Sequence, residues 1–236
     1  MKNRYIRNIQ TPKIGKEGQN RLKSARALIA GAGGLGSTVI ANLASLGIGT
    51  LGIIDKDIIE ISNLNRQFLH TPVKIGQKKA FSAKEWVNNY NPEITVHAYD
   101  IELQKENYQE IVKDYELIID CFDSVKSKFL LNDIALQTNK TLVHAGVSEW
   151  QGQVMTISRK NPCLECVFGT SGITEPPKGV TSPLVSLIAS LESIEAMKIL
   201  LKEPCTEGLL HFDGLSGRLV TIKTAKDNSC LCCNKF

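Results

Sequence analysis

The chain has little excess charge of either sign and few aromatic side chains. Its 236 residues include 28 Lys or Arg and 24 Asp or Glu, for a net charge of +4, and 6% are aromatic. No basic run is dense enough to follow a phosphate backbone, so nucleic acid is excluded as a partner. With 42% hydrophobic and 22% charged residues, the composition is that of an ordinary globular protein. Disordered, collagenous and coiled-coil chains are excluded as well.

The sequence also lacks a secretory leader and a convincing membrane span. The first seven residues include three basic side chains and do not form the apolar core of a signal peptide. Residues 27–54 carry no charge and are long enough to cross a bilayer, but seven glycines interrupt them. A strand, a tight turn, a helix and a second strand explain this stretch better. We therefore expect a cytoplasmic protein with no membrane partner.

Strands and helices alternate along the first 146 residues. Hydrophobic periodicity predicts strands at 27–30, 51–54, 94–99, 116–120 and 141–145, and helices at 16–23, 35–46, 77–90, 103–112 and 125–138. Such alternation indicates a parallel sheet with right-handed crossovers. The expected fold class is α/β: a Rossmann-like, doubly wound, mostly parallel sheet with helices on both faces.

The pattern changes after Gly146. Strands are predicted at 153–158, 209–213 and 219–224, and a long helix at 184–202. Residues 170–182 are rich in Gly, Pro, Ser and Thr and are predicted to be a mobile loop. The late strands should extend the same sheet as antiparallel strands, so we expect a single domain over 1–236. Its expected parts are an N-terminal arm (1–25), a nucleotide-binding half (26–146) and a C-terminal half (147–236).

A glycine-rich turn follows the first predicted strand. It holds Gly31, Gly33, Gly34 and Gly36, and Asp55 ends the next strand. Glycines let the backbone approach a phosphate, the helix start supplies N–H donors, and the acid can accept a hydrogen bond from a ribose. The turn indicates a nucleotide without choosing between NAD, FAD and ATP. The structural alternative is a turn that only packs a helix on a strand.

Two Cys-x-x-Cys pairs lie in the C-terminal half. They are Cys163 with Cys166 and Cys230 with Cys233. In a chain without a secretory signal, such pairs are more typical of metal ligands than of disulfides. Four thiolates suit a structural Zn²⁺ in a closed tetrahedral site, the alternative being chance pairing. Cys232, inside the second pair, could replace one ligand.

Charged residues of the types that a triphosphate needs lie between these motifs. Arg66 and Lys79 could meet phosphate oxygens. Asp123 follows a strand at the carboxyl edge of the predicted sheet and could hold Mg²⁺. Each residue also has a plain interpretation as a surface charge, since Lys79 is one of a cluster of lysines and such clusters are usually solvated.

Taken together and in this order, the motifs resemble those of the ThiF/MoeB/HesA proteins, bacterial relatives of ubiquitin-activating enzymes. The resemblance runs from Arg4 to the last cysteine pair. Its marks are the Gly31–Gly36 turn, Asp55-x-Asp57, Ser62-Asn-Leu-Asn-Arg-Gln67, Gly76-Gln-Lys-Lys79, Cys121-Phe-Asp123 and the two Cys-x-x-Cys pairs.

The resemblance implies a nucleotidyltransferase that uses Mg-ATP to adenylate a small ubiquitin-like sulfur carrier of the ThiS/MoaD type, which ends in Gly-Gly. The carrier's terminal carboxylate would attack the α-phosphorus of ATP, and pyrophosphate would leave. A carboxylate is already a nucleophile, so the work of the protein is positioning and charge stabilisation. The product is a mixed anhydride that a sulfur nucleophile can open.

The resemblance also implies a role for each matching residue. The implied nucleotide site consists of the glycine turn, Asn63 and Arg66 at the phosphates, Asp55 at the ribose, Asp57, Lys79 (rather than Lys78) at the transferring charge, and Asp123 at the magnesium. Arg7 matches an arginine that family members contribute across a homodimer interface to the partner's ATP. The arm that carries it is short and polar, so we expect it to be mobile unless a partner surface fixes it.

One position departs from the family pattern. Many members carry a cysteine in the loop before the long helix, where this chain has Glu175 followed by two prolines. A covalent carrier intermediate at that loop is therefore in doubt. The chain shows no sulfurtransferase motif after its last cysteine pair, so we expect a separate sulfur donor.

Three other functions fit parts of the sequence. The enzyme could adenylate another C-terminal carboxylate, such as that of a small peptide. An NAD-dependent oxidoreductase would explain the glycine turn and Asp55 but would leave Arg66, Lys79 and the cysteine pairs unused. A zinc-stabilised scaffold for ubiquitin-like partners would leave the charged residues unused. The residues are compatible with thiamine, molybdopterin or another sulfur pathway.

Overall fold

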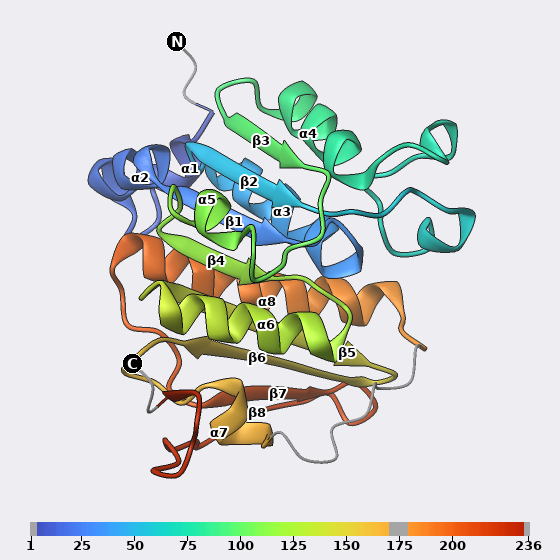
Figure 1. Ribbon diagram of the computed structural model, residues 1–236. Coiled ribbons are helices and arrows are strands. Elements are labelled where there is room, and N and C mark those ends of the chain that lie inside the picture. The colour runs from blue at the N-terminus through green and yellow to red at the C-terminus, as the bar shows by residue number, and fades with distance from the viewer. Residues whose placement is uncertain (1–3, 170–178, 234–236) are drawn as a thin grey trace.

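One eight-stranded sheet runs through the protein (Figure 1). The computed structural model describes residues 4–169 and 179–233, and the strand order is β3-β2-β1-β4-β5-β6-β7-β8. The parallel strands are β1 (Arg26–Ala30), β2 (Thr50–Ile54), β3 (Thr95–Tyr99), β4 (Leu117–Asp120) and β5 (Thr141–Ser148). The antiparallel additions are β6 (Gln151–Ile157), β7 (Leu209–Asp213) and β8 (Arg218–Ile222). The predicted mostly parallel sheet with an antiparallel extension is confirmed.

Helices cover both faces of this sheet. One face carries α2 (Gly15–Ser24), α3 (Gly34–Leu46), α4 (Lys79–Tyr90) and α8 (Ser182–Leu201), and the other carries α5 (Tyr108–Val112), α6 (Val125–Gln137) and α7 (Leu164–Phe168). Each face has its own hydrophobic cluster. The strands β1, β2 and β4 are buried almost throughout, as parallel strands with both faces covered should be. Over the described ranges, no helix has the length and apolarity needed to cross a membrane.

The order in which the strands are added reverses between β1 and β4. From β1 the chain builds outward through β2 to β3, then returns to the other side of β1 to form β4. In open α/β sheets, the loops on the two sides of such a reversal run in opposite directions and leave a crevice at the carboxyl edge of the sheet. Ligands of open α/β sheets bind at such a reversal. This topology brings Gly31 and Asp123 to the same edge.

Some element boundaries differ from those predicted. The helix predicted at 103–112 begins only at Tyr108, because the Asn107 side chain accepts from Gln104 N at 2.9 Å and donates to the Glu102 carbonyl at 2.8 Å. These side-chain bonds hold a turn in place of a helix. The short helix α7 was not predicted. Of the loop predicted at 170–182, residues 170–178 lie outside the described part of the chain.

The N-terminal arm is attached to its own chain. It forms the short helix α1 (Ile6–Ile9), and Tyr5 just before it is buried. The Tyr5 hydroxyl accepts from Asn91 Nδ2 at 2.8 Å, and a Cβ on Gly47 would lie 2.4 Å from the Tyr5 ring. For residues 4–25, the part of the arm that the structure describes, the expectation of mobility was therefore wrong, because the buried Tyr5 side chain anchors it.

Candidate functional site

The glycine turn at the end of β1 leaves no room for a side chain at two positions. Gly31 has a φ of 113°, and a Cβ there would lie 2.6 Å from the Cys121 carbonyl oxygen. A Cβ on Gly36 would lie 2.1 Å from the Gly31 carbonyl oxygen. The turn thus packs against β4 on one side and against the first turn of α3 on the other. This close approach puts a helix N-terminus at the crevice, where its free N–H groups can bind phosphate.

Asp55 ties the turn to the end of β2. Its Oδ2 accepts from Ala32 N at 2.8 Å, and its Oδ1 accepts from Asp57 N at 2.8 Å. Burial raises the pKa of Asp55, while these two N–H donors and the Lys79 ammonium act in the opposite direction. Each carboxylate oxygen has a second lone pair, so the residue can still accept from a sugar hydroxyl.

The two neighbouring lysines, Lys78 and Lys79, differ in burial and in the carboxylates that they contact. Lys79 is buried, and its Nζ lies 3.2 Å from Asp57 Oδ2. Lys78 is only partly buried, with a side chain that is 42% exposed, and its Nζ lies 3.0 Å from Asp100 Oδ1. The interpretation of Lys79 as a solvated surface charge is therefore wrong, since Lys79 is the member of the cluster that faces the Asp55–Asp57 strand end.

The loop between β2 and α4 carries Asn63 and Gln67. The short 3₁₀ helix η1 (Ile61–Asn63) has a capping box in which Asn63 Oδ1 accepts from Glu60 N at 3.0 Å. Gln67 is buried, its amide nitrogen lies 3.7 Å from where a Cβ of Gly33 would be, and its Oε1 has no partner among the described residues. Asn63 thus shapes the loop, and Gln67 reaches the glycine turn.

Arg66 crosses the start of α3. A Cβ on Gly34 would lie 3.6 Å from the aliphatic part of Arg66. Its guanidinium is half-exposed and donates to the Ser62 carbonyl at 3.0 Å and to Asn65 Oδ1 at 2.8 Å. The cation is held beside the glycine turn while part of it stays open to a ligand.

Asp123 is exposed in the turn between β4 and α6, above a buried ionic network. Within the network, Asp120 Oδ2 lies 2.7 Å from His144 Nδ1 and 3.4 Å from Lys128 Nζ. Burial acts to raise the pKa of Asp120, but the Lys128 charge and the His144 hydrogen bond outweigh it and lower that pKa. Asp120 also accepts from Phe122 N at 3.2 Å, so the network fixes the turn that presents Asp123.

A second buried pair lies on the other face of the same strand end. The Cys121 thiol donates to Glu192 Oε2 at 3.8 Å, and Glu192 Oε1 has no partner within the described chain. Both groups are buried, and burial raises the pKa of both. The Cys121 thiol therefore stays protonated and is not a nucleophile.

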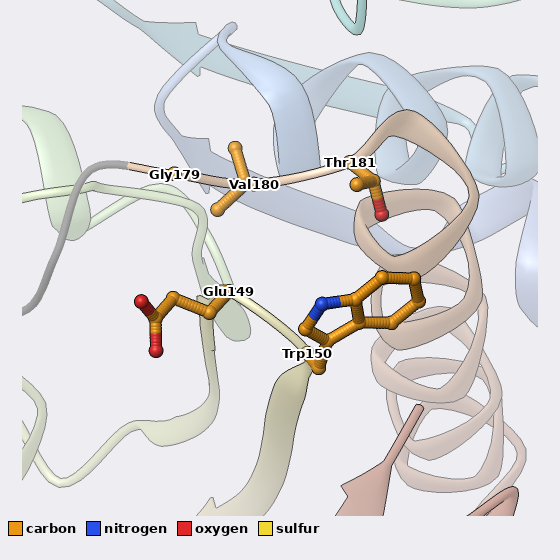
Figure 2. A pocket seen from close by; sticks show the side chains of 5 residues that line it. All are labelled: Glu149, Trp150, Gly179, Val180 and Thr181. Atoms are coloured by element: carbon orange, nitrogen blue, oxygen red, sulfur yellow. The ribbon is translucent and has the colours of Figure 1, made fainter. Parts of the chain in front are cut away.

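A hollow lies beside the carboxyl end of β5 (Figure 2). Glu149 and Trp150, in the turn between β5 and β6, form one wall, and Gly179, Val180 and Thr181, just before α8, form the other. Trp150 is 48% exposed, and its ring lies beside Thr181 in Figure 2. The Glu149 N–H donates to the Gly179 carbonyl at 2.7 Å and holds the two walls together. Sequence analysis did not single out this hollow.

The four predicted metal ligands meet in one cluster. Cys163, Cys166, Cys230 and Cys233 place their Sγ atoms within 4.8 Å of one another, with the closest pairs 3.5, 3.6 and 3.8 Å apart. A tetrahedron of thiolates at a metal–sulfur distance of about 2.3 Å has edges of about 3.8 Å. Backbone N–H groups of residues 227 and 233 point at two of the sulfurs. The cluster could therefore hold one tetrahedral metal ion.

Cys232 lies beside this cluster, where its side chain interacts with Cys163 and with two residues of α6. Its thiol donates to Asp133 Oδ1 at 3.0 Å and accepts from Asn132 Nδ2 at 3.4 Å. Asn132 Oδ1 also accepts from Leu164 N at 3.0 Å. Asn132 thus links α6 to both cysteine pairs, and Cys232 is not among the four thiols that converge.

Of the residues predicted to form the nucleotide site, Arg7 is the one that lies far from the glycine turn in the structure. It lies on α1, which Tyr5 fixes to Gly47 at the C-terminal end of α3, whereas the glycine turn is at the N-terminal end. The 13 residues of α3 span about 20 Å. Figure 1 shows α1 at the edge of the sheet opposite to the strand ends that carry the turn. Arg7 is exposed and does not reach the site of its own chain.

Comparison with known proteins is consistent with this arrangement. Residues 5–232 match the model of the ThiF family, and the chain belongs to that family. The sulfur carrier protein adenylyltransferase of Thermus thermophilus is 34% identical over 248 residues, which cover 98% of this chain and 90% of that protein. The SAMP-activating enzyme E1 of Haloferax volcanii is 34% identical over 241 residues, with 98% and 88% covered.

Other relatives are longer. The adenylyltransferase and sulfurtransferase MOCS3 of Dictyostelium discoideum is 39% identical over 240 residues, 98% of this chain but 56% of that protein. The chain spans about half the length of this relative and of several others. Among solved structures, E. coli MccB with MccA-N7isoASN has a TM-score of 0.87 at 23% identity, covering 99% of this chain and 75% of that one. At this identity the likeness shows a shared fold.

Proposed function

We propose that the chain is an ATP-dependent adenylyltransferase that activates the C-terminal glycine of a small ubiquitin-like sulfur carrier. The observation that carries the proposal is the convergence of the glycine turn, the buried Lys79 and the exposed Asp123 on the carboxyl edge where the strand order reverses. Membership of the ThiF family and the names of the relatives from Thermus and Haloferax support it.

The site suits nucleophilic attack on the α-phosphorus of ATP. The triphosphate would lie against the glycine turn with the ribose at Asp55. The carrier's carboxylate oxygen forms a bond to the α-phosphorus as the bond to pyrophosphate breaks, and no proton needs to be removed. Lys79 and Arg66 offset the charge that brings two anions together, and one well-placed charge of this kind lowers a barrier by about 3 kcal/mol.

Asp123 suits Mg²⁺. Its carboxylate is exposed at the crevice, and Mg²⁺ prefers a few carboxylate oxygens together with substrate phosphates. Bound there, the ion would neutralise charge on the leaving pyrophosphate. The ionic network of Asp120, His144 and Lys128 would hold the Asp123 turn in place while the metal and ATP come and go.

The four-cysteine cluster suits structural Zn²⁺. Thiolates are preferred ligands of zinc, and a site with four of them has no open position for catalysis. The ion would join residues 163–166 to residues 230–233. It would stabilise the C-terminal half and stay remote from the adenylation chemistry.

The carrier's tail would reach the nucleotide past the hollow at Trp150. This hollow opens at the same edge of the sheet as the crevice, beyond β5. A tail ending in Gly-Gly has little bulk, so backbone contacts and the flat Trp150 ring would hold it. A peptide with a larger last side chain is the alternative substrate of the same site.

Sulfur would come from a separate donor. Four of the seven cysteines form the cluster, and Cys232 is bonded to Asp133. Cys121 is buried, and Cys205 follows the far end of α8, whose 20 residues span about 30 Å from the hollow. No thiol of the chain is therefore both accessible and close to the adenylate.

The neighbouring lysines give the matched test of adenylation. Lys79→Ala should slow carrier-dependent pyrophosphate exchange into ATP at least 100-fold, the scale of one lost charge-stabilising group. Lys78→Ala should keep the rate within about threefold, because that ammonium pairs with Asp100 outside the site. A carrier ending in Gly-Gly and a small peptide are assayed side by side. Absence of exchange with every C-terminal carboxylate would refute the proposal.

A homodimer completes the site in this proposal. Arg7 does not reach the glycine turn of its own chain, so it would act in the site of a partner copy. The segment between β2 and α4, which projects beyond the sheet in Figure 1, exposes large apolar side chains: Ile61 is 77% exposed, Val73 86% and Phe81, at the start of α4, 52%. Such a surface is typical of a protein interface. A two-fold dimer would use it twice.

Subunit mixing tests the dimer. Arg7→Ala and Asp123→Ala should each be inactive alone and folded, since both side chains are exposed. After random exchange, half of the dimers are mixed and one of their two sites has both residues intact. Activity should therefore return to about a quarter of wild type. If exchange is verified by mass spectrometry and no activity returns, Arg7 does not act across an interface.

A further inference from the structure

Ala32, the second residue of the glycine turn, is held at both of its backbone polar groups. Its N–H donates to Asp55 Oδ2 at 2.8 Å, and its carbonyl oxygen lies 2.9 Å from His70 Nε2. A carbonyl oxygen only accepts hydrogen bonds, so Nε2 must carry the proton and donate. His70 is 4% exposed and cannot touch a ligand in the crevice.

The other ring nitrogen connects His70 to the helix of Lys79. Nδ1 lies 3.0 Å from the Ser82 hydroxyl, which donates to it when the ring is neutral. Ser82 is three residues after Lys79 on α4, so the two side chains lie on neighbouring positions of the helix surface. Burial lowers the pKa of His70, and the charges of Lys79 and Lys74 lower it further. The ring is therefore neutral, with the proton on the nitrogen that faces the turn.

The peptide unit after Ala32 explains what this arrangement achieves. All described peptide bonds are trans, so the Ala32 carbonyl and the Gly33 N–H point in opposite directions from one planar unit. A carbonyl held toward the buried His70 sends the Gly33 N–H away from the protein interior. Without the histidine, the glycine-rich backbone could rotate this unit and present a carbonyl dipole to an anion.

We propose that His70 is a positioning residue that aims the Gly33 N–H at a phosphate of the nucleotide and couples the turn to the helix of Lys79. The inference rests on the proposed function, because it takes ATP as the ligand of the turn. No sequence motif singled out His70, whose contribution depends on three segments that only the fold brings together.

Two substitutions at His70 separate its two bonds. His70→Gln keeps an amide N–H donor near the position of Nε2, whereas His70→Asn has its amide near Nδ1 and leaves the Ala32 carbonyl without a donor. His70→Asn should raise both the KM for ATP in pyrophosphate exchange and the calorimetric Kd for ATP about tenfold, the scale of one buried hydrogen bond. The KM for the carrier should not change. His70→Gln should restore the ATP affinity to within about threefold of wild type.

The control is the His→Gln substitution at His97, which lies on β3. His97→Gln alters a partly buried residue whose Nδ1 lies 3.3 Å from the Tyr115 hydroxyl, and its ATP affinity should stay at the wild-type value. A purely structural role for His70 would lower the melting temperature or the active fraction and leave the KM for ATP unchanged. Wild-type ATP affinity in His70→Asn would overturn the proposal.

Should His70→Asn fail to fold, Ser82→Ala provides the second test. Alanine suits the helix and removes only the donor to Nδ1, so ATP affinity should fall about threefold. Unchanged affinity would overturn the coupling between the turn and α4. Calorimetry measures ATP binding without a carrier. If the chain binds ATP but does not exchange pyrophosphate, only the adenylation proposal is refuted. The His70 inference is then still decided by the ATP affinities.

Discussion

The two halves of the sheet are held together by different means. In the nucleotide-binding half, β1, β2 and β4 are buried under helices on both faces, and Gly31 and Gly36 in the turn after β1 lie closest to backbone atoms of their neighbours. In the C-terminal half, every residue of β8 is exposed. There four thiols from two distant segments of the chain lie within 4.8 Å of one another.

The difference shows how each half keeps its shape. Burial of apolar strands contributes roughly 25 cal/mol per Å² and fixes the first half with no help from a ligand. In the second half, β6 and α8 are buried in the same way, but β8 is exposed, and residues 230–233 meet residues 163–166 through the four thiols. We expect perturbations of the first half to act on packing and perturbations of the second to act through metal binding.

The largest effect is expected at the tightest contact. Gly36→Ala would put a Cβ 2.1 Å from the Gly31 carbonyl oxygen, so the turn or the helix must move. Unfolding free energy should fall by about 3 kcal/mol or more, and ATP binding should be lost. Ser45→Ala on the exposed side of α3 is the control and should stay within about 0.5 kcal/mol. Urea unfolding and calorimetry measure both, and a Gly36→Ala protein with normal ATP affinity would contradict the packing argument.

An intermediate effect is expected at the thiol cluster. Cys166→Ser should remove the bound zinc, about one ion per chain, and lower the melting temperature by several degrees. The affinity for ATP should change less than twofold, because the cluster lies outside the crevice. A chelator should destabilise the wild type and leave Cys166→Ser unaffected.

Cys205→Ser is the matched control for the cluster. It changes a half-buried thiol outside the four ligands and should retain the zinc and the melting temperature. Zinc content is measured by atomic absorption. A metal-free wild type that melts at the same temperature as the loaded protein would show that the cluster does not hold the C-terminal half together.

The smallest effect is expected from Glu192, where the two halves meet. Burial raises the pKa of Glu192 well above its ordinary value, so the folded chain binds a proton that the unfolded chain loses near pH 4.3. The stability from this proton is complete below that pH and is lost as the pH rises toward the folded pKa. Glu192→Gln does not titrate, so its advantage in unfolding free energy should grow from pH 5 to pH 8, to about 1 kcal/mol or more.

Glu195 lies one turn further along α8, and its replacement by Gln should have the opposite effect on the unfolding free energy. It is also buried, but its carboxylate accepts from Thr206 N at 2.9 Å, from the Thr206 hydroxyl at 2.8 Å and from Lys198 Nζ at 2.6 Å. Glu195→Gln should therefore destabilise the protein at every pH. Denaturant unfolding across the pH range measures both variants, and equal pH profiles would show that the missing partners of Glu192 do not matter.

Much of the fold could be predicted from the sequence because local signals and burial agree. The strand predicted at 209–213 is β7 without a change of boundary, and α3 begins one residue before its predicted start. The prediction failed where a distant contact decides the local structure. Tyr5 packs against Gly47 and accepts a hydrogen bond from Asn91, and nothing within residues 4–9 indicates these two distant partners.

The site was predictable as a set of motifs and less so as an arrangement. The sequence does contain a signal for Lys79: with Ala83 and Val87 it repeats every four residues, and all three are buried on α4. Lys78 falls outside this repeat. The bonds of His70 and the Asp120 network carry no such pattern, because their partners lie on strands and helices far apart in the chain.

The tightness of the glycine turn also bears on how such a chain can change over generations. At Gly36 even one methyl group would lie 2.1 Å from a carbonyl oxygen, so this position of the glycine turn tolerates no substitution. The β5–β6 turn, the residues before α8 and the exposed β8 carry no comparable constraint. A lineage that adopts a new carboxylate substrate would therefore alter these outer segments and inherit the turn unaltered.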